Sequence, residues 1–468
     1  MFDEIGRDQV LVAFAGADAG TEPLTWGQKA IWQDMQDSGN QFTMAGRMRL
    51  PEGTTLDGAL VRLSGLIGRH AALRTRLATD HTGRPRQDVA GSGEMSLDIL
   101  TVPDDLDRAD VARYAAHLMD TLPLARFDFH RDWPLRMALI RHRGAWLHLV
   151  WALSHLVADG GAHELLLDDL IADETGAARD PRRLHILDVA RSEQAPQLRQ
   201  LSSRAMRHWE AQLRHIPAQT FGDPTPPPDR TGPRHWQVRF TSAAAHLALL
   251  AIARRTGTDA SRAALAVIAT AIGRVTAMSS LTIKVMVNNR FRPGLANVIA
   301  PIAQNSVVTI DVSDASIDEV VARARGAALT AGMRAYYDPD ELREVSARLD
   351  AERGYPAAVT CRINDQRAMV LRAEDQSAPG EVTLDQVRQR RDETTLTWLG
   401  LRENMHEQAN ILIENRSDVF SLHMLWDLWS LSNAQVEAIL RGVEEVALEA
   451  AFDPTAATKV SAGPGHRR

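Results

Sequence analysis

The chain has 468 residues, of which 44% are hydrophobic and 24% are charged, so it can bury two cores of about 200 residues each. The formal net charge of −7 is small for this length, and lysine and arginine are scattered, which argues against the basic patches of a nucleic-acid-binding protein. No apolar run approaches the ~20 residues of a membrane span, residues 1–20 lack the pattern of a signal peptide, and the single cysteine, Cys361, excludes an internal disulfide. These features predict a two-lobed cytoplasmic protein that contacts neither nucleic acid nor a membrane.

Helical and strand-like patterns are mixed along the chain. Leu56, Leu60, Leu63 and Ile67 recur at helical spacing, whereas residues 147–153 form an almost wholly apolar strand. Further helices are predicted at about residues 109–122, 162–172, 199–213, 243–255, 260–275 and 433–450. Further strands are predicted at residues 281–287, 307–312, 357–363, 409–413 and 420–426. Since both kinds of element occur together, the predicted fold class is α/β (α+β).

Proline, glycine and charged residues gather in two places, residues 176–183 and residues 223–233. We take the first cluster as the boundary between lobes. The prediction is therefore an N-terminal lobe at residues 1–178, a C-terminal lobe at residues 179–454, and a flexible tail at residues 455–468, where apolar periodicity is lost.

One histidine has a well-defined place at the end of the apolar strand. His155 follows Ser154 and precedes Asp159, Gly160 and Gly161, so its imidazole is expected just before a tight turn. A neutral imidazole can accept a proton from an amine or hydroxyl, or donate a hydrogen bond as charge develops. The alternative is a hydrogen-bonded histidine of the core.

A metal site is the other chemistry that these residues suggest. His155, Asp159 and His163 would share one face if the segment were helical, but Gly160 and Gly161 would interrupt that helix. We therefore predict no metal.

The segment resembles the His-His-x-x-x-Asp-Gly motif of nonribosomal peptide synthetase condensation domains, within the acyltransferase superfamily that includes chloramphenicol acetyltransferase. Ser154 stands in place of the first histidine, and His155, Asp159 and Gly160 match the rest. Other segments resemble motifs of the same family and occur in the same order, namely residues 24–32, 69–75, 127–136, 208–209, 287–290, 300–306, 336–339 and 426–427. The resemblance extends over nearly the whole chain.

The resemblance implies two chloramphenicol-acetyltransferase-like lobes arranged as a V, with a tunnel between them. It implies that His155 is the catalytic residue and that Asp159 is structural, its carboxylate paired with an arginine from the second lobe, for which Arg290 is the match. Gly160 would allow a sharp turn next to the substrate. Ser154 is either a plain small residue or a hydroxyl that orients His155.

The resemblance also implies the partners. No cofactor is expected to be bound permanently. The donor would arrive on the phosphopantetheine arm of a peptidyl or acyl carrier protein, and the acceptor would be a small molecule or carrier-bound. Because the chain lacks adenylation and carrier motifs, it resembles a free-standing, monomeric enzyme that finds its carrier protein in trans.

Three functions remain open at this stage. The first is acyl transfer from a carrier-bound thioester to an amine or hydroxyl, giving an amide or ester in nonribosomal peptide or hybrid polyketide biosynthesis. The second is a catalytically inactive module that recruits a partner enzyme to a carrier protein, which the replacement at Ser154 favours. The third is a coenzyme-A-dependent acyltransferase with the same histidine chemistry.

Overall fold

A computed structural model describes residues 5–175, 184–217, 221, 234–356, 358–368, 382–402 and 407–462 of the protein. The two clusters of proline, glycine and charge, at residues 176–183 and 223–233, lie outside the described residues, and so does the predicted boundary between lobes. Within the described part of the chain, no helix is both long enough and apolar enough to cross a membrane.

The chain forms two compact units. Unit 1 comprises Met1–Arg199 and Asn289–Ala303, and unit 2 comprises Gln200–Asn288 and Gln304–Arg468. These bounds differ from the predicted ranges 1–178 and 179–454 in two respects. Unit 1 continues to Arg199, and it includes a segment from much later in the chain, because that segment makes its contacts with residues of unit 1.

The C-terminal segment also differs from the flexible tail that we expected at residues 455–468. As far as residue 462, where the description ends, it packs on unit 2. Thr458 and Val460 are buried, Ile317 N–H donates to the carbonyl of Ala456, and Asp314 N–H donates to the carbonyl of Val460. Backbone hydrogen bonds hold this segment although it has no apolar periodicity.

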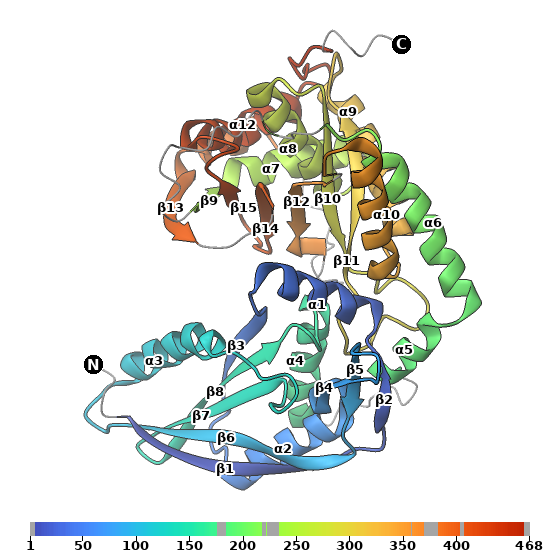
Figure 1. Ribbon diagram of the computed structural model, residues 1–468. Coiled ribbons are helices and arrows are strands. Elements are labelled where there is room, and N and C mark those ends of the chain that lie inside the picture. Colours follow the sequence, from blue (N-terminus) through green and yellow to red (C-terminus); the bar gives the residue numbers. More distant parts are fainter. Residues whose placement is uncertain are drawn as a thin grey trace. The chain divides into compact units, whose positions relative to one another are not determined.

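A five-stranded sheet forms the centre of unit 1 (Figure 1). Its strands lie in the order β1 (Gly6–Ala15), β6 (Ser92–Val102), β7 (Leu135–His142), β8 (Ala145–Ser154) and β3 (Thr43–Arg49). Only β6 and β7 are parallel among these pairs. A small second sheet has the order β2 (Gly20–Pro23), β5 (Pro85–Val89) and β4 (Thr75–Thr79).

Helices cover both faces of the larger sheet. On one face α3 (Arg108–Thr121) buries Val111 and Tyr114 against Ile140 of β7 and Val150 of β8. Toward the other face lie α2 (Leu56–Arg69) and α4 (Gly160–Thr175). Two more helices, α1 (Trp26–Ser38) and α5 (Ile186–Glu193), precede α6 (Pro196–Leu213), which runs across the division of the chain. Short 3₁₀ helices occupy Ala71–Arg74 and Leu122–Leu124.

Unit 2 contains a seven-stranded sheet. Its order is β11 (Gln304–Asp311), β10 (Ser280–Val287), β12 (Cys361–Asp365), β14 (Ala409–Glu414), β15 (Phe420–Asp427), β9 (His235–Ser242) and β13 (Thr395–Arg402). The pairs β10–β12 and β12–β14 are parallel and the others antiparallel. Both units therefore mix sheets with helices, and the predicted α/β (α+β) class is confirmed.

Four helices build the main core of unit 2 on one face of this sheet (Figure 1). They are α7 (Ala243–Thr256), α8 (Ala260–Thr276), α9 (Ile317–Arg334) and α12 (Asn433–Ala451). On the opposite face, near the β11 edge, α6 and α10 (Pro339–Arg353) pack on Val307 through Trp209 and Leu349. The remaining short elements are α11 (Leu384–Gln389) and 3₁₀ turns at Gln366–Ala368 and Arg391–Glu393.

Candidate active site

The end of β8 places His155 at the start of a tight turn. Ser154, the last residue of the strand, donates its N–H to the carbonyl of Pro134 at 2.8 Å, and His155 donates its N–H to the carbonyl of Phe42 at 2.9 Å. These two bonds fix the backbone that leads into the histidine. The sequence predicted that His155 lies at the end of a strand and before a turn, and the structure places it there.

The imidazole of His155 is half-buried, and its Nδ1 atom is buried without a hydrogen-bond partner among the described residues. Buried polar atoms in folded proteins nearly always have a partner, so an unpartnered ring nitrogen needs an explanation. Because Nδ1 has no solvent contact, an acceptor cannot reach it, and any proton transfer by this ring would use the other nitrogen, Nε2.

The hydroxyl of Ser154 holds the turn. It is fully buried and accepts the N–H of Leu156 at 3.2 Å. Val157 N–H adds a bond to the carbonyl of Ser154, also at 3.2 Å. This contact stabilises the backbone next to His155, and no bond joins the Ser154 hydroxyl to the imidazole within the described residues.

Each carboxylate oxygen of Asp159 accepts two hydrogen bonds. Its Oδ1 accepts from Arg290 Nη2 at 2.5 Å and from the Ala162 N–H at 2.8 Å, and its Oδ2 accepts the N–H groups of Ile302 and Ala303, each at 2.9 Å. The side chain is only 2% exposed. With four donors on two oxygens and no access to solvent, this carboxylate acts as a structural anchor.

Arg290 joins the same network from the segment Asn289–Ala303. Its Nη1 donates to the carbonyl of Val298 at 2.8 Å, and its side chain is 8% exposed. A Cβ atom on Gly161 would lie 2.2 Å from Arg290 Nε, so glycine is required there for the close approach. The structure therefore brings Asp159 and Arg290 together, as the resemblance implied, but both belong to unit 1.

Two glycines were not among the predicted site residues although the network depends on them. Besides Gly161, Gly27 of α1 allows the carbonyl of Pro301 to approach, since a Cβ there would lie 1.7 Å from that oxygen. Gly160, which we did predict, is the first residue of α4 and is not among the residues with positive φ. The glycine pair thus begins a helix instead of interrupting one, and Gly161 has the tight contact.

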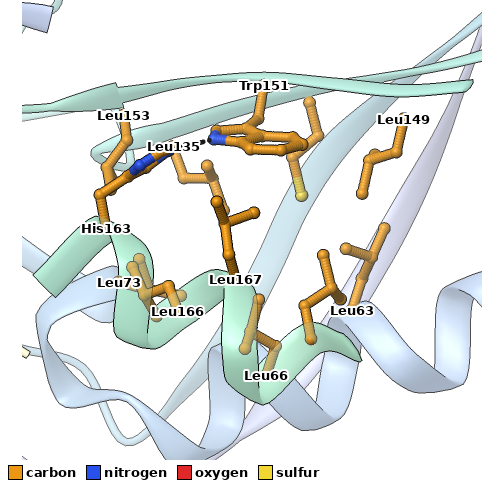
Figure 2. A pocket seen from close by; sticks show the side chains of 12 residues that line it. Leu63, Leu66, Leu73, Leu135, Leu149, Trp151, Leu153, His163, Leu166 and Leu167 are labelled. Carbon is orange, nitrogen blue, oxygen red and sulfur yellow. Dashed lines mark hydrogen bonds between the residues drawn. The ribbon is translucent and has the colours of Figure 1, made fainter. Parts of the chain in front are cut away.

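His163 lies on α4 beside an apolar cavity of about 40 Å³ between the sheet and helices α2 and α4 (Figure 2). The indole Nε1–H of Trp151 donates to His163 Nε2 at 3.0 Å, and burial lowers the pKa of this imidazole. A neutral ring accepting from Trp151 must carry its proton on Nδ1. Leucines supply most of the lining, so His163 belongs to an apolar core region.

No group of three or more histidine, cysteine, aspartate or glutamate side chains within the described residues could hold a metal ion. The single cysteine is buried in β12, and burial raises the pKa of its thiol to about 12. Cys361 is therefore protonated at neutral pH and is a poor nucleophile.

One of the motifs that resemble the family, residues 69–75, supports the core of unit 1. Arg74 is fully buried, donates to the carbonyls of Ile67 and Asp18 at 3.2 and 3.0 Å, and has its pKa lowered by burial. His70 Nε2 lies 2.5 Å from Asp169 Oδ2 and links the end of α2 to α4. These side chains hold the helices in place beneath the turn that contains His155.

The chain is similar to known proteins of one family. The family model described as "Condensation domain" matches residues 18–382. A probable non-canonical nonribosomal peptide synthetase, CymA, of Salinispora arenicola (strain CNS-205) is 28% identical over 332 residues, which is 66% of this chain and 4% of that protein. The chain thus spans a small part of that relative's length.

Solved structures share the fold over nearly the whole chain. One is described as the molecular basis for condensation domain-mediated chain release from the enacyloxin polyketide synthase, with a TM-score of 0.69, 15% identity, and coverage of 92% of this chain and 83% of that one. Another is the complex of the X-domain and OxyB from teicoplanin biosynthesis, with a TM-score of 0.65, 19% identity, and coverage of 96% and 97%.

Proposed function

The chain belongs to the condensation domain family, and from this premise we propose that it transfers an acyl group from a thioester to an amine or hydroxyl acceptor. The product would be an amide or ester in nonribosomal peptide or hybrid polyketide biosynthesis. The donor would be held on the phosphopantetheine arm of a peptidyl or acyl carrier protein, and the acceptor would be a small molecule or a second carrier-bound group. The observation that supports this proposal most directly is the half-buried imidazole of His155 at the start of a hydrogen-bonded turn.

Acyl transfer from a thioester requires few catalytic groups from the protein. A thioester is already a good electrophile, so the main tasks are to align the acceptor and to stabilise the tetrahedral intermediate. The acceptor nitrogen or oxygen attacks the carbonyl carbon, the C–S bond breaks, and the imidazole of His155 takes the acceptor's proton and returns it to the departing thiolate. No covalent protein nucleophile is needed.

Asp159, Arg290 and Gly161 act as positioning residues in this proposal. Their hydrogen bonds fix the loop after β8 and the start of α4, and hence the direction of the His155 side chain. Since the Asp159 carboxylate already accepts four N–H groups, it has no free position for a substrate proton. Acid–base catalysis is therefore assigned to His155 alone.

The test is a product assay with purified protein, a donor-loaded carrier protein and a panel of amine and hydroxyl acceptors. His155→Ala is expected to lower the rate about 10²- to 10⁴-fold. His117→Ala, at an exposed position on α3, is the control and is expected to retain the full rate. Parallel reactions with the same acyl group on coenzyme A separate a carrier-dependent enzyme from one that uses a free thioester. An unchanged rate in the His155→Ala protein would contradict the proposal.

Recruitment of a partner enzyme is the second candidate, and the residue at position 154 favours it. Ser154 replaces one motif histidine, and its buried hydroxyl serves the backbone turn. A protein of similar fold, the teicoplanin X-domain, has been solved together with OxyB. Recruitment predicts no product with either donor, together with a stable complex between this chain, a loaded carrier protein and a partner enzyme on gel filtration.

A further inference from the structure

A row of polar side chains crosses the unit 2 sheet on the face opposite to helices α7, α8, α9 and α12. Lys284 of β10 is in register with Arg362 of β12, which is in register with Asn410 of β14. The neighbouring residues Ile283 and Ile363 point into the helical core. Because successive side chains of a strand point to opposite faces, this basic row (Lys284, Arg362 and Asn410) lies on the other face.

Glu407, just before β14, lies next to the two cations. Its Oε1 accepts from Lys284 Nζ at 3.4 Å and is 3.7 Å from Arg362 Nη1. Burial alone would raise the pKa of this carboxyl, but Arg362 and Lys284 outweigh it and lower the pKa. Glu407 is therefore ionised, and Lys284, Arg362 and Glu407 together have two positive charges against one negative charge.

Lys284 and Arg362 have more N–H donors than the hydrogen bonds that they form with described residues. Lysine has three N–H donors and arginine five, whereas among the described residues the bonds formed are one long contact from Lys284 Nζ and one from Arg362 Nε to Asn410 Oδ1 at 3.3 Å. The side chains of Lys284 and Arg362 are still 25% and 22% exposed. A network that served only stability would be expected to use short, saturated bonds, as the Asp159 carboxylate does.

One more polar atom in the same part of the sheet lacks a contact. Asn364 lies two residues beyond Arg362 on β12, so it faces the same side, and its Oδ1 is buried without a partner among the described residues. Lys284 and Arg362 supply donors, and Asn364 Oδ1 is an unused acceptor, so the site suits a ligand that has an anionic group with an N–H or O–H donor beside it.

We propose that the basic row binds the anionic group, a carboxylate or a phosphate, of a small molecule. A guanidinium and an ammonium side by side are the donors that proteins use for both groups. That this molecule is a substrate rests on the proposed acyl transfer, in which the anion would be the carboxylate of a free acceptor or the phosphate of the phosphopantetheine arm. The binding itself does not depend on that reaction.

The test is equilibrium binding by calorimetry at low ionic strength with two matched pairs of probes. N-Acetylalanine and N-acetylalaninamide differ in charge only at the carboxylate, and 4′-phosphopantetheine and pantetheine differ in the phosphate. The anionic member of one pair is expected to bind about tenfold tighter or better than the neutral one. The pair that shows this preference identifies the source of the anion.

Variants then test the residues. Arg362→Met and Lys284→Met are expected to abolish the preference, whereas Arg239→Met, whose arginine pairs with Glu414 on the same sheet, is the control and is expected to keep it. Glu407→Gln removes the competing negative charge and is expected to tighten anion binding. A purely structural ion pair predicts no such gain.

The outcomes separate this inference from the proposed reaction. His155→Ala protein that keeps the anion preference but forms no product supports both. Equal binding of charged and neutral probes by the unaltered protein overturns the proposal that the basic row binds an anion, even if product still forms. A preference that persists in both Arg362→Met and Lys284→Met overturns it as well.

Discussion

The carboxylate of Asp159 accepts the hydrogen bonds that hold the loop after β8 in place. Replacing it with asparagine removes the charge opposite Arg290 and puts an NH₂ group where an oxygen accepts N–H donors. Because Arg290 would be left buried without its counter-ion, we expect Asp159→Asn to lower the free energy of unfolding by about 3–5 kcal/mol. Urea unfolding at neutral pH measures the change.

Asp385→Asn is the matched control for this substitution. The Asp385 side chain is 84% exposed, and its nearest arginine nitrogen is 4.0 Å away, so the expected change is below about 0.5 kcal/mol. Equal stabilities for the two variants would show that the Asp159–Arg290 pair contributes nothing to folding.

Gly161 gives a second prediction at a single residue. An alanine Cβ there would lie 2.2 Å from Nε and 3.0 Å from Cδ of Arg290, whose guanidinium is held by Asp159 and the Val298 carbonyl. The side chain cannot move away without losing those bonds, so Gly161→Ala is expected to cost about 1–3 kcal/mol. Thermal unfolding checks the value.

The comparison position is Gly326 in α9, where an added Cβ meets nothing within 4 Å. Alanine is the better helix former, so Gly326→Ala is expected to raise stability by about 0.5–1 kcal/mol. Opposite signs for the two glycines are the expected result, and a loss at Gly326 as large as that at Gly161 would overturn the explanation by close approach.

Among the elements, α2 and α4 pack over the apolar cavity beside His163. Leu66 of α2 lines this cavity and is 5% exposed, so Leu66→Ala enlarges an existing void. We expect a loss of about 2–5 kcal/mol in the free energy of unfolding. Val61→Ala is the control on the same helix, because that side chain is 74% exposed. A loss for Leu66→Ala no larger than that for Val61→Ala would mean that the cavity wall readjusts freely.

Elements with a strong apolar pattern could be predicted from the sequence, and edge strands could not. The leucine spacing predicted α2, and the apolar run predicted β8. The edge strands β1 and β3 of unit 1 were not predicted, because few of their side chains are buried and so little apolar alternation marks them. Strand β12 begins at Cys361, four residues later than the predicted start at residue 357.

The same contrast applies to the candidate site. His155, Asp159 and Arg290 could be named because their side chains match a motif, and the structure joins the last two. The N–H groups of Ile302 and Ala303 could not be named, since a backbone donor leaves no trace in residue type. From the sequence, Gly161 was expected only to allow a turn. Its close contact with Arg290 could not be predicted, because the two residues are 129 positions apart in the sequence.

At the scale of the whole molecule, the sequence predicted two lobes but a single point of division. The structure instead assigns Asn289–Ala303 to unit 1 although the chain on both sides belongs to unit 2. Composition reports where loops lie and not which distant residues they contact. The assignment depends on long-range bonds such as those from Arg290 to Asp159, which only a three-dimensional structure reveals.

The stability of the whole chain should depend on pH through three partly buried histidines. Burial lowers the pKa values of His148, His163 and His246 in the folded state. Below the ordinary value of about 6.5, the unfolded chain takes up protons that the folded chain does not, so the free energy of unfolding falls as the pH falls. Each such histidine contributes a slope of at most about 1.4 kcal/mol per pH unit, and the contribution is fully present above pH ~7.5.

His163→Gln isolates one of these groups, since glutamine can still accept from Trp151 but does not titrate. Between pH 7.5 and 5 most carboxyl groups stay ionised. Over this range the free energy of unfolding should fall less for His163→Gln than for the unaltered protein. His117→Gln, at an exposed position, should follow the unaltered curve. Urea unfolding at half-unit steps of pH gives both curves. If His163→Gln and the unaltered protein lost stability in parallel, His163 would take up its proton as readily in the folded chain as in the unfolded one, and the apolar cavity would not exclude the charge.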